Sequence, residues 1–338
     1  MTDARNGLAE LHTHLGGSVA SDALWSLAHE QGIALPVKDY WEFDALVTVS
    51  DPRGVESLDA LDAIYHWTEL IQSSPLAVER SVHGAIGGAY RSQGITTLEL
   101  RFNPMKRNRG GERDLDHIIL AAVRGLDRAR LEYPQVRAGL ILMMDRTFDR
   151  RQNEVIVEKA IHWAERGIVG VDIAGPRPGG ARYDYTQVAP MVETAREAGL
   201  GITIHVGEEG GAYGREEIGE VVERLRPDRI GHGILAAEDA ELMSLLRDAG
   251  VVLEICPTSN LLTKALPDED AVRRTIRRFV DHDVAFTIAT DGPEMMRTHL
   301  RDELELLRRI GALDEAELAT ANERGHTASF VGRERALA

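Results

Sequence analysis

Residues 7–17 read GLAELHTHLGG, an apolar run that carries His12 and His14 and ends at two glycines. The two histidines stand two positions apart, so in a β-strand their side chains point to the same side. Seven more short apolar runs follow, and the eight predicted strands cover residues 7–14, 96–104, 137–145, 168–175, 201–209, 228–234, the 250s and 284–293. Helical patterns separate them. Two of these patterns end at Gly199 and Gly250, where glycine can adopt the left-handed conformation that caps a helix.

Strands that alternate with helices predict a parallel sheet covered on both faces. Eight such units predict a closed (β/α)8 barrel, also called a TIM barrel. About 80 residues separate the first strand from the second, so residues 15–95 should hold a helical insertion after strand 1. Two of its helices are predicted at 58–71 and 76–94, and we expect the insertion to cover the barrel mouth. No linker rich in Pro, Gly or Ser interrupts the pattern, which favours one domain over residues 1–338.

The charge balance limits the partners of the protein. Its 338 residues include 39 Lys and Arg against 55 Asp and Glu, a formal net charge of −16, whereas binding to nucleic acid needs a basic face. The one cysteine, Cys256, excludes an internal disulfide framework and favours a reducing compartment. The N-terminus lacks a signal-peptide profile, and no run of about 18 apolar residues could span a membrane. We therefore expect a cytoplasmic protein that acts on a small-molecule substrate.

Five polar side chains stand near the C-terminal ends of predicted strands: His12, His14, His205, His232 and Asp291. In a parallel barrel all of these ends open on one face, so residues far apart in the sequence should meet there. A lone histidine at a strand end is more often a hydrogen-bonded structural residue, but independent placement would not gather five such groups on one face. Imidazole nitrogens and a carboxylate suit Zn²⁺ or Fe²⁺.

Three carboxylates near these strands need an interpretation. Glu208 follows His205 in HVGEE at the barrel mouth, where a carboxylate beside a metal site suits general acid/base chemistry. One of the pair Glu208 and Glu209 is expected to be only a solvated loop residue, and we assign that place to Glu209. Asp172, inside the apolar strand IVGVDIAG, is either a residue that orients a metal ligand or a hydrogen-bonded core carboxylate, and both interpretations stay open.

Five motifs in order, HTHLGG, HVGEE, RIGHG, CPTSN and ATDGP, resemble those of the adenosine deaminase branch of the metal-dependent amidohydrolases. The resemblance runs from about Leu8 to Pro293. It implies that one zinc ion is bound by His12, His14, His205 and Asp291. It also implies that Glu208 carries a proton to the ring nitrogen of the substrate, that His232 orients and deprotonates the attacking water, and that the backbone amide of Gly175 contacts the purine edge.

Two positions depart from the family pattern. Gly16 stands where the family has an aspartate that reaches the ribose 5′-hydroxyl, and Gly292 where it has an aspartate that contacts the purine five-membered ring. Neither aspartate is a metal ligand, so hydrolysis should survive while substrate selection changes. At Gly16 the change removes repulsion of an anionic 5′ group and opens space. The resemblance thus implies a zinc-dependent deaminase of a 6-aminopurine nucleoside, or of a relative with an altered 5′ group such as an anionic one.

Basic and aromatic residues near the mouth could compensate for these losses. The loop FNPMKRNRGG (102–111) contains Lys106, Arg107 and Arg109, which could hold a phosphate or carboxylate or form a solvated rim. Aromatic residues of the insertion could cover a planar base, but their helical spacing favours core packing. These aromatic residues are Trp41, Phe43, Tyr65 and Trp67.

Three alternatives stay open. A dinuclear hydrolase or amidase barrel usually has a bridging lysine at the end of strand four, where this chain has Gly175, so one metal is favoured. A binder without catalysis would not need Glu208 and His232 in addition to all four ligands. A deaminase of a non-purine heterocycle is kept open by the loss of the carboxylate at Gly292.

Overall fold

The computed structural model describes residues 7–49, 55, 58–108, 115–176, 181–209 and 213–333. Eight parallel strands form one sheet in the order β1 to β8, which confirms the predicted barrel. The strands are β1 Leu8–His14, β2 Ile95–Phe102, β3 Arg137–Asp145, β4 Ile168–Ala174, β5 Gly201–Val206, β6 Arg229–His232, β7 Val252–Ile255 and β8 Phe286–Ile288. Each strand pairs with the next one along the chain, so all strand C-termini lie at one end of the barrel.

The barrel closes between β1 and the segment that follows β8. Thr13 and Asp291 form a parallel bridge. The amide of His14 donates to the carbonyl of Asp291 at 2.7 Å, and the amide of Asp291 donates to the carbonyl of His12 at 2.9 Å. This seam therefore places three of the predicted metal ligands side by side.

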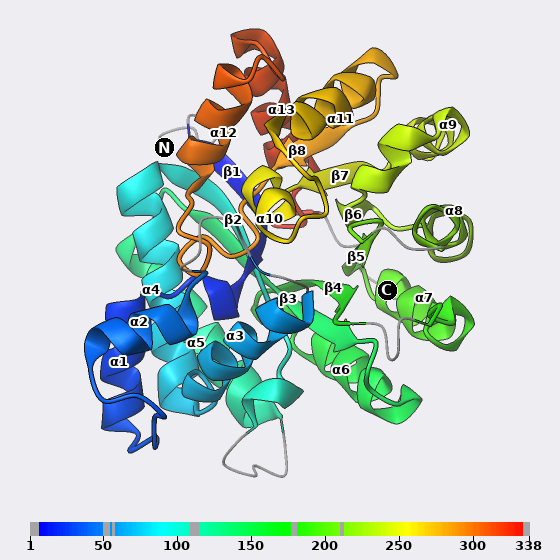
Figure 1. Cartoon of the computed structure of the whole chain (residues 1–338). Coiled ribbons are helices and arrows are strands. Elements are labelled where there is room, and N and C mark those ends of the chain that lie inside the picture. The colour runs from blue at the N-terminus through cyan, green and yellow to red at the C-terminus, as the bar shows by residue number, and fades with distance from the viewer. Residues whose placement is uncertain are drawn as a thin grey trace.

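Helices surround the strands and bury an aliphatic core between the two layers (Figure 1). The helices after β2 are α5 Asp116–Glu132, α6 Arg150–His162, α7 Ala189–Glu197, α8 Gly214–Leu225, α9 Ala240–Asp248, α10 Pro257–Leu262, α11 Glu269–Asp281, α12 Leu300–Arg309 and α13 Glu315–Ala328. Gly199 and Gly250 have φ angles of 76° and 69°. These angles confirm the left-handed conformation predicted at the ends of two helices.

The described residues of the insertion between β1 and β2 form four α-helices: α1 Ser21–Glu30, α2 Tyr40–Val47, α3 Leu58–Ile71 and α4 Pro75–Gln93. Helix α3 has the predicted bounds and packs on the turn that follows β1. Helix α4 packs along α5 and β2, so it belongs to the outer ring. Helices α1 and α2 form a small apolar cluster around Phe43. Among the described residues of the insertion, only those of α3 line the cavity at the barrel mouth. The part of the insertion that covers the mouth is therefore smaller than predicted.

Charged side chains fill part of the barrel interior. Arg101 on β2 donates to Glu254 at 2.8 Å and to Asp172 at 2.9 Å. Arg229 on β6 donates to the other oxygen of Glu254 at 2.6 Å and also to Glu99. All five side chains are fully buried. Such burial is tolerated because each charge meets opposite charges and further hydrogen bonds.

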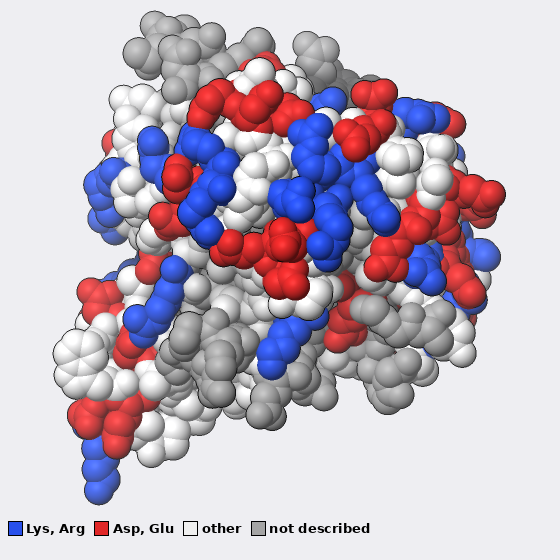
Figure 2. Space-filling model, turned by 45° about the horizontal axis from the view of Figure 1, so that its top comes forward, with Lys and Arg blue, Asp and Glu red and all other residues white. Residues whose placement is uncertain are grey.

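The surface carries charges of both signs. On the face drawn in Figure 2, groups of basic side chains alternate with groups of acidic ones. Within the described part of the chain, no helix combines the length and the apolar character that a bilayer crossing requires.

The buried ion network predicts that substitution of a buried arginine destabilises the protein much more than substitution of an exposed one. Arg229→Met leaves the carboxylates of Glu99 and Glu254 without this buried cation and should destabilise the protein by roughly 3–5 kcal/mol. Arg247→Met removes an exposed partner of Asp248 and should cost less than about 1 kcal/mol. Urea unfolding followed by circular dichroism measures both values. Equal losses in the two variants would contradict the role assigned to the network.

Candidate active site

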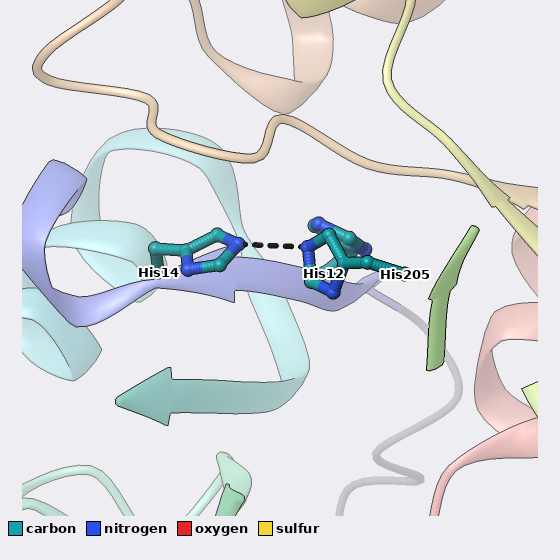
Figure 3. Close-up of side chains that lie close together, drawn as sticks. All are labelled: His12, His14 and His205. Atoms are coloured by element: carbon teal, nitrogen blue, oxygen red, sulfur yellow. Dashed lines mark hydrogen bonds between the residues drawn. The ribbon is translucent and has the colours of Figure 1, made fainter. Parts of the chain in front are cut away.

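Four predicted ligands meet at the C-terminal end of the barrel. The Nε2 atoms of His14 and His205 lie 3.1 Å apart, and Asp291 Oδ1 lies 3.3 Å from His14 Nε2 and 3.7 Å from His12 Nε2. Figure 3 shows the three imidazole rings facing one another above β1. A tetrahedral zinc ion with bonds of about 2.0–2.1 Å holds its ligand atoms about 3.3 Å apart. The four donor atoms therefore suit such an ion.

Hydrogen bonds behind the rings fix which nitrogen faces the centre. His12 Nδ1 lies 2.6 Å from Glu254 Oε2, and His205 Nδ1 lies 3.1 Å from Asp172 Oδ1. Carboxylates at Nδ1 keep the ring proton there and turn the Nε2 lone pair towards the centre. His12 Nε2 is buried and forms no hydrogen bond within the described residues, which is consistent with a ligand atom. Burial also lowers the pKa values of His12 and His14 well below their usual range, so both rings are neutral.

The two interpretations of Asp172 can now be compared. Its carboxylate contacts His205 and the guanidinium of Arg101. Burial acts to raise its pKa, but His205 and Arg101 outweigh that effect and lower the pKa to about 2. An ionised carboxylate against His205 Nδ1 favours the role of orienting a ligand. Arg101 and Glu254 were not recognised from the sequence, although Glu254 is a charged residue inside an otherwise apolar strand and Arg101 shares its buried strand with a second charged residue, Glu99.

The CPTSN motif positions two further residues of the site. Ser259 Oγ donates to Asp291 Oδ2 at 2.7 Å, which leaves Oδ1 to face the histidines. Asn260 Nδ2 lies 3.0 Å from His232 Nδ1. His232 and Asp291 have φ angles of 61° and 65°, a left-handed conformation that costs roughly 1–2 kcal/mol in non-glycine residues. Sequence reasoning identified the motif but did not assign these contacts.

Cys256 offers a different grouping of donors. Its sulfur lies near His12 and His232 in a second set of potential ligands. Burial raises the pKa of the Cys256 thiol well above its usual value, and nearby carboxylates such as Asp291 raise it further. The thiol is therefore a poor source of the thiolate that binds metals. The grouping with three histidines and a carboxylate fits better.

Glu208 and His232 stand beside the candidate centre. Glu208 Oε2 lies 3.6 Å from His232 Nε2, and both side chains line the same cavity as His14, His205 and Asp291. Burial lowers the pKa of His232 to about 4 although Asp291 opposes the shift, so the ring is neutral near pH 7. Glu209 lines this cavity as well. It therefore lies nearer the site than we predicted, since it was expected to be only a solvated loop residue.

The side chains around the candidate centre line one cavity that opens to solvent at the C-terminal end of the barrel. Gly175 lines it, as predicted, with a φ of 89°. Tyr65 on α3 also lines it, and the same side chain packs against the apolar cluster that includes Met295 and Met296, as expected for a core residue. A Cβ at Gly16 would lie 3.0 Å from Tyr65 Cδ1, and one at Gly292 would lie 3.3 Å from Tyr65 Oη. The space expected to open beside Gly16 is thus occupied by Tyr65.

The other three aromatic residues considered above, Trp41, Phe43 and Trp67, do not line the cavity. Trp41 is 77% exposed, so the expected core packing is wrong for this side chain. Phe43 and Trp67 pack in the apolar cluster of α1 and α2, as expected for core residues.

The three basic residues predicted near the barrel mouth do not form one cluster around the cavity. Lys106 lines the cavity and pairs with Asp145 Oδ2 at 2.7 Å. Arg107 is only 1% exposed and pairs with Glu69 at 3.3 Å; it does not line the cavity, so it is a buried structural cation and not an anion contact. Arg109 lies outside the described residues. The sequence analysis missed Arg146, which lines the cavity and donates to the carbonyls of Gly175 and His205.

A (β/α)8 barrel whose C-terminal end gathers three histidines and an aspartate beside Glu208 and His232 is typical of metal-dependent hydrolases. The sequence model of the family described as "Adenosine deaminase" matches residues 7–338. The adenosine deaminase of Vibrio vulnificus (strain CMCP6) is 30% identical over 308 residues, which cover 91% of this chain and 89% of the relative. The chain therefore belongs to the adenosine deaminase family, which is metal-dependent, and it is a hydrolytic deaminase that acts on C–N bonds.

Two solved structures share the fold at lower identity. The adenine deaminase from Arthrobacter aurescens superposes with a TM-score of 0.84 and 21% identity, over 97% of this chain and 94% of the other. The N6-mAMP deaminase of Arabidopsis superposes with a TM-score of 0.81 and 23% identity, over 98% of this chain and 96% of the other. The names of these three proteins refer to different kinds of substrate: a nucleoside (adenosine), a free base (adenine) and a nucleotide (N6-mAMP).

The ligand geometry predicts that one histidine controls metal content. His205→Ala removes a nitrogen at the centre and should reduce the bound divalent metal from about one per chain to a small fraction, because three remaining ligands bind more weakly. His162→Ala, at an exposed position at the end of α6, should leave the content unchanged. Elemental analysis by mass spectrometry measures both. Full occupancy in the His205 variant would remove this residue from the ligand set.

Proposed function

We propose that this protein is a zinc-dependent aminohydrolase that replaces the exocyclic amine of a 6-aminopurine nucleoside, or of a 5′-modified relative, by oxygen and releases ammonia. One observation carries the proposal: three of the four metal-ligand candidates, His14, His205 and Asp291, line one cavity together with Glu208 and His232. Metal ligands alone would suit a structural site, whereas an acid/base pair beside them suits hydrolysis. A cytoplasmic location, predicted from the single buried thiol of Cys256, is part of this proposal, and so is the single domain.

The donor set supports zinc, with Fe²⁺ as the alternative metal. Three imidazole nitrogens and one carboxylate oxygen, from His12, His14, His205 and Asp291, are typical ligands of Zn²⁺. When bound, the ion supplies a Lewis acid that lowers the pKa of water to about 7. Gly175 follows β4 in place of a lysine that could bridge a second metal, which supports a mononuclear site.

Residues of the chain would perform the proton transfers. His232, neutral in its buried position, would accept a proton from the water that attacks the ring carbon. Glu208 would donate a proton to the adjacent ring nitrogen, which makes that carbon more electrophilic and prepares the departure of ammonia. Gly175 follows β4 and lines the cavity, and its amide would hold the purine edge.

The acid/base assignment predicts different effects at two adjacent glutamates. Glu208→Gln keeps the shape of the side chain but removes the transferable proton, so kcat should fall by at least about 10²–10⁴-fold. Glu209→Gln should change kcat much less. Ammonia release from a 6-aminopurine nucleoside measures both, with metal content as the check on folding. Equal losses in the two variants would show that the assignment within HVGEE is wrong.

Gly16 and Gly292, which replace two substrate-binding aspartates of the family pattern, predict a substrate preference different from that of a typical adenosine deaminase. Adenosine should be a poorer substrate than an analogue with a different 5′ group, because no carboxylate at position 16 accepts a hydrogen bond from the 5′-hydroxyl. The comparison is kcat/KM for adenosine, AMP and 5′-carboxylated and 5′-thio analogues. A preference of the enzyme for adenosine by tenfold or more, which is about 1.4 kcal/mol of transition-state stabilisation, would contradict this expectation.

A further inference from the structure

A buried glutamate on α12 joins two segments that border the candidate centre. The side chain of Glu303 is fully buried. Its Oε2 accepts a hydrogen bond from the amide of Thr258 at 3.0 Å, and its Oε1 accepts one from the hydroxyl of Thr298 at 2.7 Å. Thr258 is the second residue of α10, and Thr298 lies in the segment that leads from Asp291 to α12. One side chain therefore fixes α10 and this segment relative to each other.

Helix α10 depends on Glu303 for an acceptor at its first turn. The first amides of a helix have no acceptor within the helix itself. Cys256, the residue before α10, makes no capping hydrogen bond with its side chain. The carboxyl of Glu303 takes that place from a different helix, so the position of α10 is set by α12.

The same short helix carries Ser259, one residue after Thr258. Ser259 Oγ donates to Asp291 Oδ2 at 2.7 Å. A displacement of α10 would break this bond, and the carboxylate of Asp291 could then turn Oδ1 away from the histidines. Partners that orient a ligand in this way typically change metal affinity by about 10–100-fold when they are removed. The contacts of Glu303 are thus one step further from the metal site than that of Ser259.

The two hydrogen bonds of Glu303 do not require its negative charge. Burial raises the pKa of its carboxyl to about 7, although the hydrogen bonds from Thr298 and Thr258 act to lower it. A protonated carboxyl can still accept from the amide of Thr258 while it donates to the hydroxyl oxygen of Thr298, because a hydroxyl both donates and accepts. The amide of a glutamine offers the same acceptor and the same donor.

We propose that Glu303 is a positioning residue for the metal ligand Asp291 and that it acts through α10 and Ser259. Its hydrogen bonds hold the backbone of α10 at Thr258 and the segment after Asp291 at Thr298. These two anchors keep Ser259 within reach of Asp291. The inference rests on the proposed function, because Asp291 is assigned there as a ligand of zinc.

The dissociation constant of Zn²⁺, measured by competition with a chromophoric chelator, tests this role without a catalytic assay. Glu303→Leu removes both hydrogen bonds and should weaken Zn²⁺ binding by at least about tenfold. Glu303→Gln keeps an acceptor and a donor and should bind Zn²⁺ nearly as tightly as the wild type. Ser259→Ala should weaken binding as well, and Glu303→Leu should add little in that background, because residues that act through one contact are not additive.

The matched control is Thr97→Val, which removes a buried hydrogen bond to His326. Thr97 lies near the start of β2, at the end of the barrel opposite to the site. This variant should keep the Zn²⁺ affinity of the wild type even where its thermal midpoint falls. If Glu303→Leu does not fold, Thr298→Val, which removes one of the two hydrogen bonds, takes its place in the comparison with Ser259→Ala.

Four results would overturn the role of Glu303 while the wild type still binds Zn²⁺. They are an unchanged affinity in Glu303→Leu, a Gln variant as weak as the Leu variant, losses that add in the double variant with Ser259→Ala, and an equal loss in Thr97→Val. A wild type that binds no Zn²⁺ would instead overturn the metal site on which the proposed function depends.

Discussion

Two buried carboxylates hold the outer nitrogens of two histidines, and the geometry of the site depends on these contacts. Glu254 bonds His12 and Asp172 bonds His205, while Arg101 lies between the two carboxylates and bonds both. Neutral rings with the proton on the outer nitrogen present their lone pairs to a cation. A buried carboxylate without Arg101 would be costly, so the same ion network that stabilises the barrel interior also sets the direction of the ligands.

The barrel brings together residues that the sequence separates. Parallel strands end on one face, and the seam between Thr13 and Asp291 joins the first strand to the segment after the last. The left-handed backbone at His232 and Asp291 turns both side chains into the site. Strain of this kind persists where surrounding contacts hold it in place; here Ser259 and Asn260 of one short motif supply those contacts.

Much of the fold and the centre of the site could be predicted from the sequence. Strand positions follow from hydrophobic patterning, and the C-terminal ends of parallel strands share one face of a barrel. The sequence alone therefore predicts that His12 and Asp291 lie close together. Side chains whose environment depends on neighbouring helices could not be placed. Tyr65 and Arg107 illustrate this limit, since helical spacing alone does not say that one faces the cavity and the other is buried against Glu69.

X-ray absorption at the metal edge of the purified protein tests the central claim that three histidines and Asp291 hold one ion. The account predicts a first shell of nitrogen and oxygen atoms at about 2.0–2.1 Å with the outer-shell scattering of imidazole rings. A sulfur atom at about 2.3 Å, which only Cys256 or a methionine could supply, would contradict the assigned ligands. A second metal at about 3.5–4 Å would contradict the mononuclear site.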